Sequence, residues 1–300
     1  MVKTKELVEL ESNVRPIEKG NLACPGCQLN LVFKHSLAAV NNNAIVVIPA
    51  CCTSVIQGAG QGFGMNVPIF NVAFAAAPPV ASGIARKLKI EGKDTQVIVW
   101  AGDGGTSDIG FASLSGAAER DEDIIYIMYN NAGYQNTGNQ KSGVTPRGAK
   151  TTTTKMGNTS RPKSVARIML AQGVSYVATA NAGYPQDLYD KISKAATEFK
   201  GHFRYIEIYS PCPPGWNIDT KDTVEVAKLA NETGMWILWE AINGKLELSR
   251  PGRRFVDKEK RAPVEEFFKL QGRFSGVSKE LLQLATEDID YEWEWVKKFQ

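Results

Sequence analysis

The sequence predicts an α/β fold with a mostly parallel sheet, helices on both faces of that sheet, and a helical C-terminal arm. Short apolar runs rich in β-branched residues alternate with longer segments of helical period, which is typical of a parallel sheet covered by helices. The chain has 300 residues, of which 43% are hydrophobic and 22% are charged. This composition indicates a folded protein, long enough for one large domain plus an arm or for two small domains.

The apolar runs predict five strands, and the segments between them predict helices. We expect strands at 44–50, 95–101, 124–130, 174–180 and 203–209. The helices are expected at 28–40, 80–90, 111–119, 164–172 and 185–200. In folds of this class, ligands bind beyond the carboxyl ends of the strands. The residues that follow each strand are therefore the first candidates for a functional site.

Two stretches depart from this alternation. Residues 136–162 are rich in Gly, Thr, Asn and Lys without periodicity, which predicts a long functional or mobile loop. After Pro213-Pro214-Gly215 the sequence becomes helical and ends in an acidic, aromatic tail at 290–295. A monomer rarely leaves such apolar side chains in water, so we expect the tail to pack on a neighbouring surface. The chain then divides into an N-terminal extension (1–23), a main domain (24–215) and an arm (216–300) that contacts partner subunits.

Charge and hydropathy exclude several classes of protein. Thirty-five Lys and Arg against 32 Asp and Glu leave a net charge of +3 that is spread along the chain, which disfavours a nucleic-acid partner. No apolar stretch approaches the roughly 18 to 20 residues of a transmembrane helix, so we expect no membrane association and a cytoplasmic location. Five cysteines are too few and too unevenly spaced for a disulfide scaffold.

The first candidate site follows two neighbouring strands. Gly102-Asp103-Gly104-Gly105 comes directly after one strand, and Asn130-Asn131 ends the next. Carboxylate, amide and backbone oxygens are ligands that Mg²⁺ takes, and glycines let the backbone approach a diphosphate at the start of a helix. A Gly-Asp-Gly turn can also merely end a strand. A GDG followed about 25 residues later by NN resembles the signature of thiamine diphosphate enzymes, and this pairing favours the cofactor site.

The second candidate site is a set of cysteines. Cys24 and Cys27 belong to one CxxC turn, Cys51 or Cys52 follows the first strand, and Cys212 follows the last. A CxxC alone fits a redox pair, half of a zinc site or chance. Four thiolates suit either Zn²⁺ or a 4Fe-4S cluster, and their spacing does not choose between the two. A thiamine-dependent oxidation needs an electron acceptor, which favours the cluster.

Taken together, these motifs resemble the β subunit of the 2-oxoacid:ferredoxin oxidoreductases, in particular the pyruvate-type branch. The resemblance runs from Leu22 to about Trp216. The segments that carry it are the CxGC, "ACCTS", "GDGGTSDIGFASLSGAAERD", "YNNAGYQNTGNQKSG" and "PCPPGW".

The resemblance implies which residues hold the cofactors. The Mg²⁺ ion would be bound by Asp103, the Asn131 side chain and the Gly133 carbonyl group. The residues expected at thiamine diphosphate are Gly102, Asp103, Gly104, Gly105, Asn131, Gly133, Val55 and Thr137. The 4Fe-4S ligands expected are Cys24, Cys27, Cys52 and Cys212, because the family's spacing selects Cys52 over Cys51. Asn136 is expected to act at the substrate and the reacting ring.

The implied activity is the thiamine-dependent oxidative decarboxylation of a short 2-oxoacid such as pyruvate, with coenzyme A as the acyl acceptor. Electrons would pass through the 4Fe-4S cluster to ferredoxin. The carboxylic acid that activates thiamine would come from another chain, so we expect an α subunit, and also γ or δ subunits, as partners.

Some residues depart from the family's pattern. Phe74 is followed by three alanines, Gln28 replaces the usual Gly after the CxGC, and Ala132 stands where a Glu is usual. These departures leave oxalate open as a substrate beside pyruvate, in which case coenzyme A would not be needed. The residues are also compatible with a non-catalytic zinc-binding subunit and with a thiamine decarboxylase that has no cluster.

Overall fold

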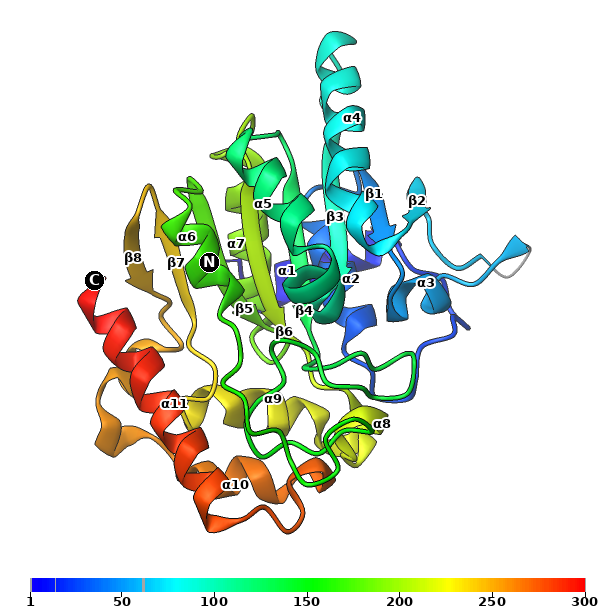
Figure 1. The fold of residues 1–300 in the computed structure, drawn as a ribbon. Helices are drawn as coiled ribbons and strands as arrows, with labels where there is room; N and C mark the ends of the chain where they lie inside the picture. The colour runs from blue at the N-terminus through cyan, green and yellow to red at the C-terminus, as the bar shows by residue number, and fades with distance from the viewer. Residues whose placement is uncertain (1, 14, 61–62, 300) are drawn as a thin grey trace.

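The computed structural model describes residues 2–13, 15–60 and 63–299, and over these ranges the chain forms one mixed sheet with helices on both faces (Figure 1). The strands lie in the order β2-β1-β3-β4-β6-β5-β7-β8. The pairs from β2 to β5 are parallel, and β7 and β8 are antiparallel. The strands are β1 (Ala44–Pro49), β2 (Ile69–Val72), β3 (Gln96–Gly102), β4 (Ile125–Asn130), β5 (Tyr176–Asn181), β6 (Arg204–Tyr209), β7 (Trp239–Ile242) and β8 (Lys245–Leu248). This confirms the predicted fold class.

The helices lie close to their predicted positions. The helices of the main domain are α2 (Leu29–Ala38), α3 (Cys52–Ile56), α4 (Ala77–Ile90), α5 (Phe111–Glu119), α6 (Val165–Ala171), α7 (Pro185–Thr197) and α8 (Pro213–Trp216). The remaining helices are α1 (Thr4–Asn13), α9 (Thr223–Glu232), α10 (Val264–Lys269) and α11 (Lys279–Lys298). Proline at the first turn starts α4 and α7, where its missing N–H group costs nothing. None of the described helices is long and apolar enough to cross a membrane.

The two faces of the sheet support two separate apolar cores. Alternate residues of one strand divide between them: Val97 and Val99 belong to the core beneath α4, α5 and α6, whereas Ile98 and Trp100 belong to the core beneath α2 and α7. This alternation follows from the two-residue period of a strand. Because β3, β4 and β6 are covered on both faces, their carboxyl ends are the places where polar side chains can gather.

The C-terminal part contains the predicted helical arm, and it also contains two strands that the sequence did not predict. β7 and β8 form an antiparallel hairpin that extends the main sheet next to β5. Each of these strands has four residues, which is too short to stand out from the helical pattern around it. β2 was missed for the same reason.

The surface against which the aromatic tail packs belongs, for Trp293, to its own chain. Trp293 lies on α11, is 2% exposed and donates from Nε1 to the Gly234 carbonyl at 3.2 Å. Arg167 stacks on Trp295, 4.5 Å from the ring centroid. Tyr291 remains 45% exposed. The helical period of α11 places Trp293 on the core face, which the composition of the tail alone did not reveal.

Candidate functional site

The Gly102-Asp103-Gly104-Gly105 segment lies at the carboxyl end of β3, as predicted. β3 ends at Gly102, and the chain turns directly into a short π-helical segment, Gly105–Ile109. A Cβ atom at Gly104 would lie 2.4 Å from the ring of Tyr134, so no side chain fits there. The Tyr134 hydroxyl donates to the Gly104 carbonyl at 3.0 Å. The backbone is therefore held tightly where a diphosphate would approach it.

Asp103 is fully buried at this turn. Burial raises the pKa of the Asp103 carboxyl group to about 7, although several hydrogen bonds oppose this shift. The Ser142 hydroxyl donates to Oδ2 at 2.5 Å, and the backbone N–H group of Asn131 donates to Oδ1 at 3.4 Å. Without a nearby cation the charged form is disfavoured, so the carboxyl group is poised to gain from a metal ion.

The side chain of Asn131 lies against Asp103 and the Gly133 carbonyl group. Its amide group ends 2.8 Å from Asp103 Oδ1 and 3.1 Å from the Gly133 carbonyl oxygen. The amide can take two orientations. With its nitrogen toward Asp103 and Gly133, Asn131 donates hydrogen bonds to both oxygens. With its oxygen toward them, three oxygen atoms face one another and no amide hydrogen lies between them. Magnesium with ligands at about 2.1 Å places neighbouring oxygens about 3.0 Å apart. The second orientation therefore fits Mg²⁺ bound by the three predicted residues.

Two side chains hold the backbone of this turn from behind. The carbonyl oxygen of Asn131 accepts from Trp216 Nε1 at 2.7 Å and from Gln135 Nε2 at 2.8 Å. Ala132 adopts a left-handed conformation with φ of 57°, which reverses the chain between Asn131 and Gly133. The turn is thus fixed by one contact within the same loop, from Gln135, and by one from a distant part of the sequence, Trp216.

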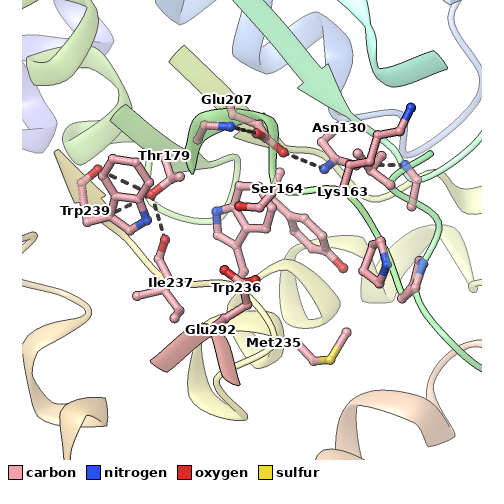
Figure 2. A pocket seen from close by; sticks show the side chains of 16 residues that line it. Asn130, Lys163, Ser164, Thr179, Glu207, Met235, Trp236, Ile237, Trp239 and Glu292 are labelled. Carbon is pink, nitrogen blue, oxygen red and sulfur yellow. Dashed lines mark hydrogen bonds between the residues drawn. The ribbon is translucent and has the colours of Figure 1, made fainter. Parts of the chain in front are cut away.

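Asn130 lines a separate cavity of about 130 Å³, where its side chain faces Glu207 (Figure 2). Its amide donates to Glu207 at 2.8 Å, and its oxygen accepts from the Ala132 N–H group at 3.1 Å. Glu207 is buried on β6, which raises the pKa of its carboxyl group to about 7, and it also accepts from the Ala166 N–H group at 3.3 Å. Asn130 therefore supports the turn from the opposite face and does not reach the cofactor cavity.

The predicted cofactor residues line one cavity of about 140 Å³, which we call the cofactor cavity. The residues in it that the sequence predicted are Gly102, Asp103, Gly104, Gly105, Asn131, Gly133, Asn136 and Thr137. Val55 does not line it and lies instead on the neighbouring cavity. The sequence predicted no role for Ser142, Tyr134 or Gln135. The last two could be singled out only by their place in the "YQNTG" segment.

Cys24, Cys27, Cys52 and Cys212 line a second cavity of about 190 Å³, which we call the cysteine cavity. Cys51 does not line it and instead faces the cofactor cavity. Cys52 lines both cavities, so the two adjacent cysteines differ in that only Cys52 reaches the cysteine cavity. Burial raises the pKa of the Cys27 thiol to about 11 and that of Cys212 to about 12.

Local structure explains how the four cysteines reach one place. The Cys27 N–H group donates to the Cys24 carbonyl at 3.0 Å and closes the CxxC turn. Gly26 has φ of 72°, and a Cβ atom there would lie 2.8 Å from the Thr220 carbonyl oxygen. Cys52 starts α3 after β1, and Cys212 precedes α8 after β6. The carboxyl ends of two parallel strands therefore bring these cysteines to the same edge of the sheet.

The two cavities share a wall. Four residues line both of them: Cys52, Asn131, Gln135 and Asn136. In the described part of the chain, no three His, Cys, Asp or Glu side chains are grouped tightly enough to hold a single metal ion. Cys24, Cys27, Cys52 and Cys212 instead line the cysteine cavity, which adjoins the cofactor cavity.

Comparison with known proteins agrees with this arrangement. The family model for the thiamine pyrophosphate enzyme, C-terminal TPP binding domain, matches residues 59–208. The chain is 41% identical over 290 residues to the ketoisovalerate oxidoreductase subunit VorB of Pyrococcus horikoshii, covering 93% of this chain and 91% of that protein. It is also 41% identical over 278 residues to the pyruvate synthase subunit PorB of Methanothermobacter thermautotrophicus, covering 90% and 93%.

A solved structure supports the fold. The 2-oxoglutarate:ferredoxin oxidoreductase from Magnetococcus marinus aligns with a TM-score of 0.57 at 22% identity, covering 72% of this chain and 81% of that one. The matches to VorB and PorB span nearly the whole of both chains, and the resemblance found in the sequence is confirmed. This chain belongs to the family of thiamine diphosphate-binding β subunits of the 2-oxoacid:ferredoxin oxidoreductases.

Proposed function

We propose that this β subunit binds thiamine diphosphate through Mg²⁺ beside a 4Fe-4S cluster, in an enzyme that oxidatively decarboxylates a short 2-oxoacid and passes the electrons to ferredoxin. The observation that carries this proposal is the wall shared by the cofactor and cysteine cavities. A cofactor that releases electrons and a centre that accepts them need to lie close together. Here the cofactor cavity and the cysteine cavity share four lining residues, Cys52 among them.

The chain's own residues would hold the diphosphate end of the cofactor. Asp103, Asn131 and the Gly133 carbonyl group supply oxygen ligands to Mg²⁺, and the glycines at 102, 104 and 105 let the backbone approach the phosphates. Ser142 orients Asp103 through its hydrogen bond. When bound, thiamine diphosphate supplies the carbanion chemistry that removes carbon dioxide from a 2-oxoacid.

The size of the cysteine cavity supports a cluster over a zinc ion. Zinc with four thiolates at about 2.3 Å would draw the sulfurs to about 3.8 Å from one another. In a cubane each thiolate binds a different iron, so the sulfurs stand farther apart around a central volume. Among the described residues, no three His, Cys, Asp or Glu side chains are grouped so that they could hold a single metal ion, and the four cysteines line an open cavity of about 190 Å³. This favours the iron-sulfur proposal over a zinc-binding subunit.

Asn136 is the residue we propose to act at the substrate. Its side chain lies on the shared wall and is exposed toward the open side of the site. An amide there can donate to an oxygen on which negative charge develops. Thr137, the next residue, is held by hydrogen bonds from its hydroxyl group to the Gln140 side chain at 2.6 Å and to the Tyr134 carbonyl at 3.4 Å.

The walls around the site favour a short apolar 2-oxoacid. Ala50 and Phe74 supply apolar surface to the cofactor cavity, where the substrate would meet thiamine. Such walls suit pyruvate or a branched 2-oxoacid better than doubly charged oxalate. The relatives named for ketoisovalerate and pyruvate point the same way. We propose pyruvate with coenzyme A as the first substrate pair to test, and oxalate, which needs no coenzyme A, as the second candidate.

The activating acid is proposed to come from an α subunit. Among the described residues that line the cofactor cavity, Asp103 is the only one with a carboxyl side chain, and we assign it to the metal. Thiamine needs a further carboxylic acid at its aminopyrimidine ring, so the site would be completed at an interface between chains. Further γ or δ subunits, and ferredoxin as the electron acceptor, belong to the same proposal.

The test is to purify the chain anaerobically with its co-purifying subunits and to measure iron, zinc, thiamine diphosphate and the visible spectrum. The proposal expects iron at the stoichiometry of a 4Fe-4S cluster in this subunit, bound thiamine diphosphate, and oxidation of pyruvate that requires coenzyme A. Zinc in place of iron would contradict the cluster assignment. Oxidation of oxalate and not of pyruvate would contradict the substrate assignment alone.

A further inference from the structure

Arg273 is a buried cation with unusual surroundings. It lies on the short 3₁₀ turn Gly272–Phe274, is 5% exposed, and packs against the indole ring of Trp216 with its guanidinium 3.6 Å from the ring centroid. Its Nε donates to the Gln271 side chain at 2.9 Å. One of its terminal nitrogens, Nη2, is buried without a hydrogen-bond partner. The side chain is therefore only partly satisfied.

No carboxylate of the described residues forms an ion pair with this guanidinium, although the Asp103 carboxyl group attracts it. The arginines at the other aromatic stacks differ: Arg167 pairs with Glu292 at 2.7 Å and Arg261 with Asp290 at 3.7 Å. A guanidinium stays protonated in proteins, and burying a charge without a counter-charge is costly. A buried arginine without a paired carboxylate would therefore be stabilised by a further negative group beside it.

The neighbours of Arg273 connect it to the cysteine cavity. The Arg273 guanidinium packs on the ring of Trp216. The backbone N–H group of Trp216 donates to the Cys212 carbonyl at 2.9 Å. Cys212 is one of the four cysteines of the cysteine cavity. Burial lowers the pKa of Arg273 to about 10, and attraction to Tyr209, Cys212 and Asp103 opposes this lowering. The guanidinium thus lies on the protein side of the cysteine cavity, behind Cys212.

We propose that Arg273 is the counter-charge of the iron-sulfur cluster and raises its reduction potential; this inference rests on the proposed function. A cubane with four thiolate ligands is anionic, and it gains one further negative charge when it accepts an electron, with no bond formed or broken. A fixed positive charge in a low-dielectric interior stabilises the reduced form more than the oxidised form. Arg273 would thereby make the cluster a better acceptor for electrons that leave the cofactor.

The experiment compares Arg273→Met and Arg273→Lys in the full chain, reconstituted anaerobically with iron and sulfide. The readouts are iron content and the cluster's midpoint potential, followed by electron paramagnetic resonance during a dithionite titration. Loss of the charge in Arg273→Met is expected to disfavour reduction by tenfold or more, which is about 59 mV for a one-electron couple. Arg273→Lys keeps a charge and is expected to stay closer to the wild-type potential. Arg261→Met, which removes another arginine stacked on a tryptophan, is the matched control and is expected to leave the potential unchanged.

The outcomes separate this inference from the proposed function. If the wild-type chain binds no cluster, the proposed function fails and takes the inference with it. If the wild type binds a cluster and Arg273→Met has the same potential, or changes only thiamine diphosphate affinity, the inference alone is overturned. If Arg273→Met cannot hold a cluster, the result for Arg273→Lys decides. A cluster retained in Arg273→Lys supports the role of Arg273 as a counter-charge. A cluster lost from both variants indicates a purely structural contact and refutes that role.

Discussion

Replacing Asp103 with Asn should stabilise the metal-free chain at neutral pH and abolish its response to Mg²⁺ and thiamine diphosphate. Asp103 is fully buried, and burial raises the pKa of its carboxyl group from 3.8 to about 7. Asn has the same shape but no charge. The variant therefore removes the buried charge with little change in packing, and it also removes the charged ligand that we assign to Mg²⁺.

The magnitude and sign follow from the two pKa values. In the unfolded chain Asp103 loses its proton near pH 3.8, whereas in the folded chain it keeps the proton up to about pH 7. Raising the pH across this window therefore favours the unfolded state, by about 4 kcal/mol at about 1.36 kcal/mol per pH unit. The wild-type chain loses this stability between pH 4 and pH 7, and Asp103→Asn does not. Glu207 also has its pKa raised to about 7, but it is present in both proteins and largely cancels in the comparison.

The assay is urea unfolding of wild type and Asp103→Asn from pH 4 to pH 8, with EDTA and then with Mg²⁺ and thiamine diphosphate. With EDTA, the unfolding free energy of the variant should gain on the wild type as the pH rises. With the ligands, only the wild type should be stabilised. A stability difference that does not change with pH, or equal stabilisation of both proteins by the ligands, would refute this reasoning.

Three further predictions follow from the same geometry. Cys52→Ala should lose the cluster and Cys51→Ala should keep it, because only Cys52 lines the cysteine cavity; iron analysis of both variants decides this, and the opposite ranking would sink the assignment. Asn136→Ala should retain thiamine diphosphate at normal stoichiometry and slow turnover, so cofactor loss on substitution would argue against a role at the substrate. Trp293→Ala should lower the free energy of unfolding by about 3–5 kcal/mol, measured by urea unfolding, because it empties a buried site; exposed Tyr291→Ala is the control, and equal small effects would contradict the packing of α11.

The sequence was sufficient where a local pattern coincides with a place in the fold. Each predicted strand lies within two residues of an observed one, because buried parallel strands are continuous apolar runs. Asp103 and Asn131 follow neighbouring strands, so the parallel topology alone brings them to the same edge. The choice of Cys52 over Cys51 came from the family's spacing and stays a prediction, although only Cys52 of the two lines the cysteine cavity.

Contacts between distant segments could not be predicted. Trp216, on α8, binds the Asn131 carbonyl, and Ser142, in a loop without sequence periodicity, orients Asp103. Asn130 looked equivalent to Asn131 in the sequence, yet it points to Glu207 on β6, a partner that only the strand order reveals. Arg273 gave no local signal either, because its lack of a paired carboxylate among the described residues is a property of the folded chain.

The central claim is that electrons pass from a thiamine-bound 2-oxoacid to a cluster held by Cys24, Cys27, Cys52 and Cys212. The most direct measurement mixes the anaerobic complex, without ferredoxin, with pyruvate or 2-ketoisovalerate and follows the cluster by visible absorption and electron paramagnetic resonance. The account predicts that one of these substrates reduces the cluster of the wild-type complex and that Asp103→Asn abolishes this reduction. A complex replete in cluster and thiamine diphosphate, whose cluster no 2-oxoacid reduces, would contradict it.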